Sequence, residues 1–301
     1  MIKNFAELEA KLSGETVKRR IAVVWAAEEH TLTAVKHIVD KGLVIPVLIG
    51  NKLEIEKVAQ KVGLDSQKFE LIPADDEVKA SELAAQLAKD GNVDGIMKGA
   101  LETGVLMKVL VNKEKGIRSK SVMSLLAFME SPNYHKIFAV TDVGLLTYPT
   151  LEQKQGALEN AVIAYRALGI NNPKVAVLAA VEHVNPKMPD SVDAGELKEL
   201  NKQGVIKDCI VEGPISYDLA MDPESKIIKK YDSPVAGDAD ILVVPDIVSG
   251  NLLAKSLTCT GGAKTCGIIL GALVPLIITS RAATIEDKYM AIILSALIGK
   301  R

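Results

Sequence analysis

Short apolar runs alternate with longer amphipathic segments along most of the chain. The runs are rich in Val and Ile and are continuous rather than alternating, as is typical of parallel strands covered on both faces. Strands are predicted at 21–25, 44–49, 69–72, 95–97, 137–140, 175–179, 241–244, 268–270 and 276–279. Helices are predicted at 4–13, 28–41, 53–62, 77–89, 102–112, 150–168, 192–202, 252–257 and 285–297.

This repeated order of strand and helix predicts an α/β fold with mostly parallel sheets. In such sheets, ligands bind beyond the carboxyl ends of the strands. Polar residues that follow the apolar runs are therefore candidates for a binding site. They are Lys98, Asp142, Glu182, Asp246, Ser280 and Arg281.

The composition argues against several classes of protein. The chain has 301 residues, a net charge of −2 and only 4% aromatic residues, which argues against a general nucleic-acid binder. Its longest uncharged stretch, 265–280, is shorter than the ~20 apolar residues that a membrane span needs. Three cysteines with no CxxC pair fit a reducing compartment, so we expect a cytoplasmic protein.

The usual signatures of nucleotide and metal chemistry are missing from the sequence. It has no GxGxxG after the first strand, no Walker motif, no GxSxG elbow and no HExxH. The cysteines are more typical of small core residues than of nucleophiles. We therefore expect neither a metal ion nor a bound cofactor.

The segment after the last apolar run carries the sharpest chemical signal. Ser280 and Arg281 follow that run, and Asp287 falls at the third position of the predicted last helix. A guanidinium suits phosphate, a hydroxyl can donate a hydrogen bond, and a carboxylate can act as a base. Thr284 and Asp287 are also spaced like a capping box, so the residues alone leave a purely structural role open.

Two further groups of residues are weaker candidates. Gly250 and Asn251 lie where a helix follows the strand at 241–244, which suits either an anion site or an ordinary capped turn. Lys98, Lys108 and Arg118 belong to a cationic set that is more typical of a solvated face, with Arg118, in a turn ahead of an apolar run, as the exception.

Several long segments resemble one known family, that of the phosphate acetyl/butyryltransferases, over nearly the whole chain. They include MKGALETGVLMKVLVNKEKGIRS, TDVGLLTYPTLEQKQGALENAV, SPVAGDADILVVPDIVSGNLLAKSL and IITSRAATIED. Two others, VNPKMP and EGPISYDLA, look more like the butyryl branch than the acetyl branch.

The resemblance implies two αβα domains of the isocitrate/isopropylmalate dehydrogenase type, with the active site in the cleft between them. We place residues 1–135 and 281–301 in the first domain and 136–280 in the second. The implied reaction is acyl-CoA + phosphate ⇌ acyl phosphate + CoA, with a butyryl or branched acyl group. Coenzyme A is then a substrate and no cofactor is bound. The resemblance also implies a homo-oligomer coupled to an acyl-phosphate kinase, without nucleic-acid or membrane partners.

Roles follow for the residues that match the family pattern. Asp287 becomes the expected base, with Ser280 and Arg281 as its catalytic partners. The expected contacts to CoA or phosphate are Arg118, Lys98, Lys108, Asp142, Glu182, Gly250 and Asn251. Lys108 stands where some acetyl-branch members have an arginine. Two alternative enzymes remain, a phosphate acetyltransferase and a two-domain metal- and NAD-dependent dehydrogenase.

Overall fold

The computed structural model describes residues 1–119, 122–280 and 283–299. It separates into two compact α/β units. The first unit comprises Phe5–Ser121 and Cys266–Arg301, and the second comprises Met1–Asn4 and Val122–Thr265. Mixed α/β architecture with mostly parallel strands, as predicted, is confirmed in both units.

The divisions between the units differ from those predicted at 135/136 and 280/281. Strand β5 (Ser124–Glu130) pairs with β6 (Phe138–Thr141), so the chain before residue 135 already belongs to the second unit. Strand β11 (Leu276–Ile277) pairs with β4 (Gly95–Lys98), so the chain before residue 280 has already returned to the first unit. Contacts between residues far apart in sequence, which composition does not reveal, set both boundaries.

The sheet of the first unit runs in the order β3-β2-β1-β4-β11-β10. Its other strands are β1 (Arg19–Val24), β2 (Val44–Gly50), β3 (Glu70–Pro73) and β10 (Lys264–Leu270). All neighbours are parallel except β10 and β11. Since β2 and β4 lie on opposite sides of β1, the strand order reverses between β1 and β4. Such a reversal is where α/β sheets characteristically open a crevice for ligands.

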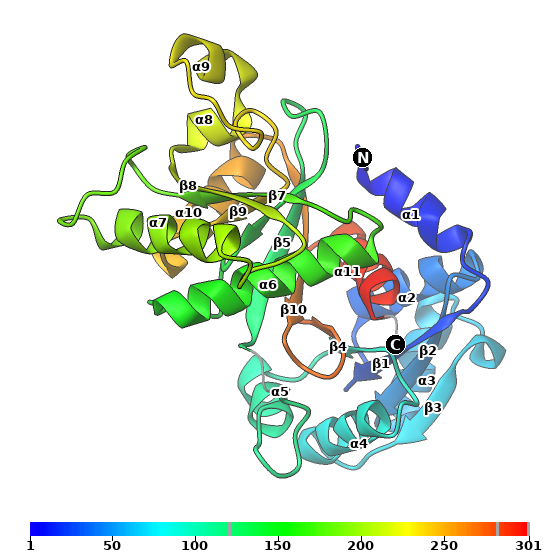
Figure 1. Cartoon of the computed structure of the whole chain (residues 1–301). Helices are drawn as coiled ribbons and strands as arrows, with labels where there is room; N and C mark the ends of the chain where they lie inside the picture. Colours follow the sequence, from blue (N-terminus) through cyan, green and yellow to red (C-terminus); the bar gives the residue numbers. More distant parts are fainter. Residues whose placement is uncertain (120–121, 281–282, 300–301) are drawn as a thin grey trace. The chain divides into compact units, whose positions relative to one another are not determined.

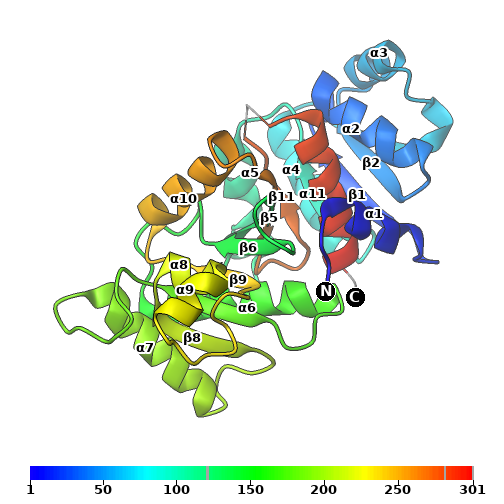
Figure 2. The same ribbon diagram turned by 90° about the horizontal axis from the view of Figure 1, so that it is seen from above.

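Helices cover both faces of this sheet. They are α1 (Phe5–Ser13), α2 (Glu29–Asp40), α3 (Lys52–Val62), α4 (Glu77–Lys89), α5 (Thr103–Leu110) and α11 (Ile285–Ile298), with a short 3-10 turn η1 (Ser66–Lys68). The last helix, α11, packs against α1 and α2, whereas α4 packs against α5 (Figures 1 and 2). Every residue of α11 from Lys288 to Ile298 is buried, so this helix is a core element of the unit.

The sheet of the second unit runs in the order β5-β6-β9-β7-β8, with only the β5–β6 pair antiparallel. Its remaining strands are β7 (Lys174–Leu178), β8 (Ile210–Ile215) and β9 (Ile241–Val243). Its helices are α6 (Leu151–Ala167), α7 (Pro189–Lys202), α8 (Tyr217–Met221), α9 (Pro223–Ile228) and α10 (Ile247–Cys259). Within the described residues, no helix is long and apolar enough to span a membrane.

Candidate active site

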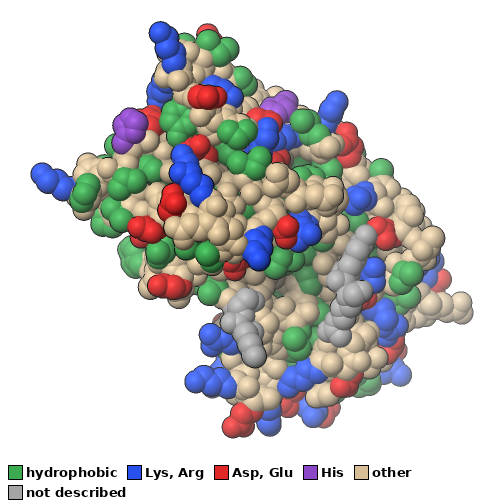
Figure 3. Space-filling model, viewed as in Figure 1, with side chains coloured by type: hydrophobic (Ala, Val, Ile, Leu, Met, Phe, Trp, Pro, Cys, Tyr) green, Lys and Arg blue, Asp and Glu red, His purple; other side chains and the backbone are tan. Residues whose placement is uncertain are grey.

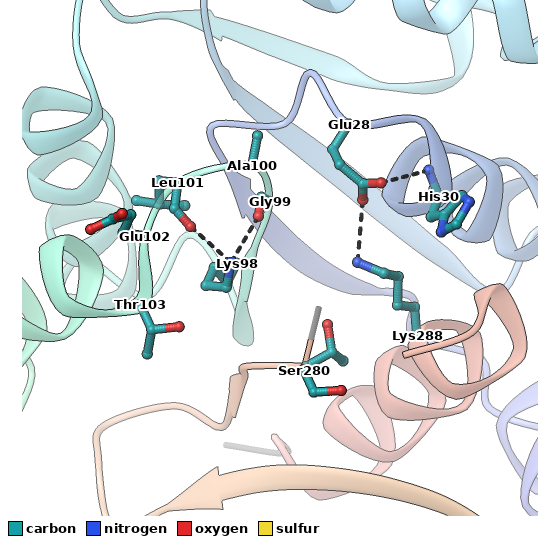
Figure 4. A pocket seen from close by; sticks show the side chains of 11 residues that line it. Glu28, His30, Lys98, Gly99, Ala100, Leu101, Glu102, Thr103, Ser280 and Lys288 are labelled. Carbon is teal, nitrogen blue, oxygen red and sulfur yellow. Dashed lines mark hydrogen bonds and ion pairs between the residues drawn. The ribbon is translucent and has the colours of Figure 1, made fainter. Parts of the chain in front are cut away.

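A pocket of about 380 Å³ opens at the carboxyl ends of β1, β4 and β11 (Figure 4). It therefore lies where the strand order of the first unit reverses. Its walls are the turn from β1 into α2, the turn from β4 into α5, the residues after β11, and the start of α11. The residues that line it are Glu28, His30, Lys98, Gly99, Ala100, Leu101, Glu102, Thr103, Thr279, Ser280 and Lys288. Lys98 and Ser280, which the sequence placed at two separate strand ends, thus line the same pocket.

Lys98 shapes the turn that forms one wall. Its Nζ donates hydrogen bonds to the carbonyl oxygens of Gly99, at 3.2 Å, and Leu101, at 2.8 Å. Gly99 is required here, because a Cβ at this position would overlap the carbonyl oxygens of Trp25 and Val24 at the end of β1. The turn is therefore held tightly against the neighbouring strand.

Helix α5 begins at this pocket without a side-chain cap. Glu102 is its N-cap residue, but its carboxylate makes no capping hydrogen bond. Within the described part of the chain, the N–H groups of Thr103 and Gly104 have no hydrogen-bond acceptor. Unsatisfied donors at a helix N-terminus, together with the helix dipole, favour an anion.

Glu28 and Lys288 form the opposite wall. The Glu28 carboxylate caps α2 by accepting hydrogen bonds from the N–H groups of His30 and Thr31, and it pairs with Lys288 at 3.2 Å. Burial by itself raises the pKa of Glu28, but the Thr31 hydroxyl, Lys288 and these N–H groups outweigh it and lower the pKa to about 2. Glu28 is therefore ionised at any working pH.

The segment from Ser280 to Asp287 connects β11 to α11. Ser280 is exposed, and its carbonyl oxygen accepts a hydrogen bond from Ala283 N–H. The predicted capping box is confirmed, since Asp287 Oδ2 accepts from Thr284 N–H at 2.8 Å and Thr284 Oγ1 accepts from Asp287 N–H at 3.1 Å. No described group donates a hydrogen bond to Asp287 Oδ1. Arg281 lies outside the described residues.

The two other basic residues expected in this unit do not line the pocket. Lys108 is exposed on α5. Arg118 is also exposed, and its backbone forms an antiparallel bridge with Ala272. The structure therefore brings Lys98 together with Ser280 but leaves Lys108 and Arg118 outside this pocket.

Three of the residues expected in the second unit lie together between the end of β6 and the start of α10. They are Asp142, Gly250 and Asn251, and their contacts are with the backbone. The Asp142 carboxylate accepts hydrogen bonds from the N–H groups of Leu125, Gly144 and Leu145. Burial raises the pKa of Asp142, and these hydrogen bonds oppose the increase. Asn251 donates to the Val143 carbonyl oxygen at 3.2 Å.

Gly250 belongs to the same cluster. A Cβ on Gly250 would lie 2.5 Å from the Asp142 carbonyl oxygen, so only glycine lets α10 approach the chain after β6 this closely. The three residues therefore fasten the start of α10 to the end of β6.

Glu182, the fourth residue expected in this unit, has other partners. Its carboxylate accepts hydrogen bonds from Lys229 and from the Ser216 hydroxyl, both at 2.9 Å. These contacts lower the pKa of Glu182.

Sequence reasoning missed several residues of the pocket. Glu28 follows the apolar run at 21–25, so the rule that selected Lys98 and Ser280 would also have found it. Lys288 gave no such signal, because it lies inside a helix and next to the more obvious Asp287. Thr103 was counted only as part of a helix. Among the described residues, no group of three or more His, Cys, Asp and Glu side chains could hold a metal ion.

The surface agrees with the balanced composition. On the face shown in Figure 3, acidic and basic side chains are interspersed and do not separate into large patches of one sign.

Comparisons with known proteins point to one family. Residues 74–296 match the family model described as phosphate acetyl/butaryl transferase. The chain is 38% identical to the phosphate butyryltransferase of Clostridium acetobutylicum, over 99% of both proteins. It is also 38% identical to the phosphate acetyltransferase of Thermotoga maritima, over 93% of this chain and 95% of that protein. Among solved structures, a branched-chain phosphotransacylase from Enterococcus faecalis V583 superposes with a TM-score of 0.82 and 31% identity, covering 93% of this chain and 99% of the other.

Proposed function

The chain belongs to the phosphate acetyl/butyryltransferase family, and from this premise we propose that it transfers a short acyl group between coenzyme A and inorganic phosphate. The observation that carries the proposal is the family match, which spans both the turn from β4 into α5 and the segment from Ser280 to Asp287. A butyryl or branched-chain group is favoured, because the phosphate butyryltransferase of Clostridium acetobutylicum matches 99% of this chain, whereas the equally identical acetyltransferase of Thermotoga maritima matches 93%.

The chemistry needs no covalent enzyme intermediate. In the direction of acyl-CoA synthesis, the CoA sulfur attacks the carbonyl carbon of the acyl phosphate. A carbon–sulfur bond forms, the bond between that carbon and the phosphate oxygen breaks, and inorganic phosphate leaves. The thiol proton passes to Asp287, which acts as the general base. The capping box supports this role, because it fixes the carboxylate through Oδ2 and leaves Oδ1 without a described partner.

Ser280 and Arg281 are proposed to stabilise the negative charges on the carbonyl oxygen and on the leaving phosphate. Ser280 donates a hydrogen bond to the oxyanion that develops on the carbonyl oxygen, a contact typically worth about 3–4 kcal/mol. Arg281 binds the phosphate and stabilises its departure. Lys98 supports the phosphate region by holding the turn from β4 into α5. Its place in the same pocket as Ser280 supports this grouping.

The wider setting follows from the same family membership. We propose that CoA is bound as a substrate, that the protein works in the cytoplasm as a homo-oligomer, and that its acyl phosphate is passed to or taken from an acyl-phosphate kinase. Three free cysteines agree with a reducing compartment.

An acetyl group is the alternative substrate, because the acetyltransferase of Thermotoga maritima is as similar in identity as the butyryl relative. A panel of acetyl, propionyl, butyryl, isobutyryl and isovaleryl phosphates, assayed by CoA thiol consumption, separates the two. We expect the highest kcat/KM with butyryl or a branched chain. A clear preference for acetyl phosphate establishes the alternative. Activity that requires NAD or is abolished by EDTA contradicts the proposed chemistry.

A further inference from the structure

Lys288 is an unusual residue for its place in the fold. It begins the buried part of α11, where the ten residues that follow it are also buried. Only 8% of its surface is exposed, yet it lines the pocket that contains Ser280. An ammonium group that is taken out of water is costly unless hydrogen bonds and an opposite charge replace the lost solvent.

The contacts of Lys288 make up for only part of the hydrogen bonding with water that its ammonium group loses on burial. Its Nζ lies 3.2 Å from Glu28 Oε2 and 3.1 Å from Thr31 Oγ1, whereas charge-assisted pairs are usually about 2.7–2.9 Å apart. Other lysines of this chain pair more closely, including Lys61 with Glu29 at 2.5 Å. The same Glu28 oxygen also accepts from the N–H and hydroxyl groups of Thr31. The Glu28 carboxylate is therefore shared between Lys288 and Thr31, and it lies farther from the ammonium than in a close ion pair.

One donor of the ammonium is left over. A lysine has three N–H donors, and within the described part of the chain only Glu28 and Thr31 accept from Lys288. Figure 4 shows the amino group projecting from α11 toward the pocket, opposite Lys98. The remaining donor is thus available to a molecule in the pocket.

The surrounding groups indicate what kind of molecule that is. The charges of the two lysines and two glutamates that line the pocket cancel. The neutral groups therefore determine which kind of ligand the pocket favours. The neutral groups that can donate a hydrogen bond there are the Thr103 N–H, which has no acceptor among the described residues, and the hydroxyls of Ser280 and Thr103. Several donors lining one pocket beside a lysine ammonium fit a tetrahedral anion rather than a cation or an apolar chain.

We propose that Lys288 is an anion-binding residue of the transfer reaction, and that its ammonium donates a hydrogen bond to a phosphate oxygen in this pocket. Glu28 and Thr31 hold the ammonium in place from behind. The oxygen belongs either to inorganic phosphate and the acyl phosphate, or to a phosphate of CoA. The role rests on the proposed function, whereas phosphate binding itself can be measured without turnover.

The test compares the wild-type chain with Lys288→Met, Lys288→Gln, Glu28→Gln and Lys61→Met. Binding of inorganic phosphate and of CoA is measured by calorimetry, with melting curves to exclude misfolded variants. Loss of a hydrogen bond to a charged group weakens binding of the affected ligand about 10- to 100-fold. We expect this loss for both Lys288 variants. Lys61→Met, which removes an ion pair with the neighbouring Glu29, leaves both affinities unchanged.

Glu28→Gln distinguishes anion binding from a purely structural ion pair. It breaks the same pair as Lys288→Met, but it removes a negative charge and leaves the ammonium in the pocket. We expect phosphate or CoA to bind as tightly as in the wild type, or more tightly. If Glu28→Gln and Lys288→Met weaken binding equally, or if Lys288→Met weakens neither ligand, the proposal is wrong. Lys288→Gln gives the same comparison if the methionine variant does not fold.

Steady-state kinetics show whether Lys288 binds inorganic phosphate or a phosphate of CoA. They also test the role of Lys288 separately from the proposed transfer activity. A rise in KM for phosphate with little change in kcat identifies inorganic phosphate, and a rise in KM for CoA alone identifies its phosphates. Normal transfer by the wild type, with variant affinities and KM values unchanged, overturns the role of Lys288 and leaves the proposed function intact. Absence of transfer by the wild type, with Lys288-dependent phosphate binding, overturns the proposed function instead.

Discussion

Replacing Asp287 by Asn separates catalysis from helix capping. Asn keeps a side-chain oxygen that can accept the hydrogen bond from Thr284 N–H, which measures 2.8 Å in the structure. The substitution removes the negative charge near the start of α11, which is worth about 0.3–1 kcal/mol. For a protein of this size, we therefore expect the melting temperature to fall by less than about 4 °C.

The expected effect on turnover is much larger. Loss of a general base typically costs about 10²- to 10⁴-fold, which corresponds to about 2.7–5.4 kcal/mol in the activation barrier. A thiol with a pKa near 8.5 is only about 3% ionised at pH 7 and half ionised at pH 8.5. Raising the pH over this range should therefore restore the rate of Asp287→Asn by about 15-fold, because the thiolate then forms without a base.

The assay is turnover against pH, for the wild type, Asp287→Asn and Thr284→Ala, together with their melting curves. Thr284→Ala removes the cap but keeps the carboxylate, so it should lower the melting temperature more and turnover less. The opposite ranking, in which Asp287→Asn retains nearly wild-type turnover, would refute the assignment of Asp287 as the base.

Three other variants, one of them with a matched control, test the phosphate contact, direct thiol attack and packing at Gly250. Arg281→Gln should weaken binding of phosphate or acyl phosphate and lower turnover without affecting the fold, and unchanged kinetics at subsaturating phosphate would contradict this role. Replacing all three cysteines should preserve the chemical step, because the CoA thiol attacks directly; burial and nearby carboxylates also raise the pKa of Cys209 to about 12. Recovery of an acyl group on a cysteine would contradict direct attack. Gly250→Ala should destabilise the protein by about 1–3 kcal/mol, because its methyl group would lie 2.5 Å from the Asp142 carbonyl oxygen. The matched change Gly104→Ala, where the new methyl group would meet no other segment of the chain within 4 Å, should not destabilise it.

The sequence predicted those elements whose periodicity or capping is strong. The helix at 77–89 was predicted at the bounds of α4, and the helix at 150–168 was predicted within one residue of each end of α6, which Thr150 caps. The strand β8 was not predicted, because Glu212, Gly213 and Pro214 interrupt its apolar run. The short helices α8 and α9 were also missed, since five or six residues give too little periodicity.

The candidate site was predicted only in part. Strand-end reasoning found Lys98 and Ser280, because each directly follows a strand or an apolar run. It had no means of showing that Gly250 is needed for close packing or that Asp142 binds three backbone N–H groups. Those functions depend on which chain segments meet in space. For the same reason, the pair of Glu28 and Lys288, 260 residues apart in sequence, was not predictable.

We propose that this chain exchanges an acyl group between CoA and phosphate in one balanced step. The most direct test incubates the purified protein with butyryl-CoA, with and without inorganic phosphate, and measures both free CoA thiol and acyl phosphate. We expect CoA release to depend on phosphate and one acyl phosphate to form for each CoA released. CoA release that continues without phosphate, or that yields free carboxylic acid in place of acyl phosphate, would contradict it.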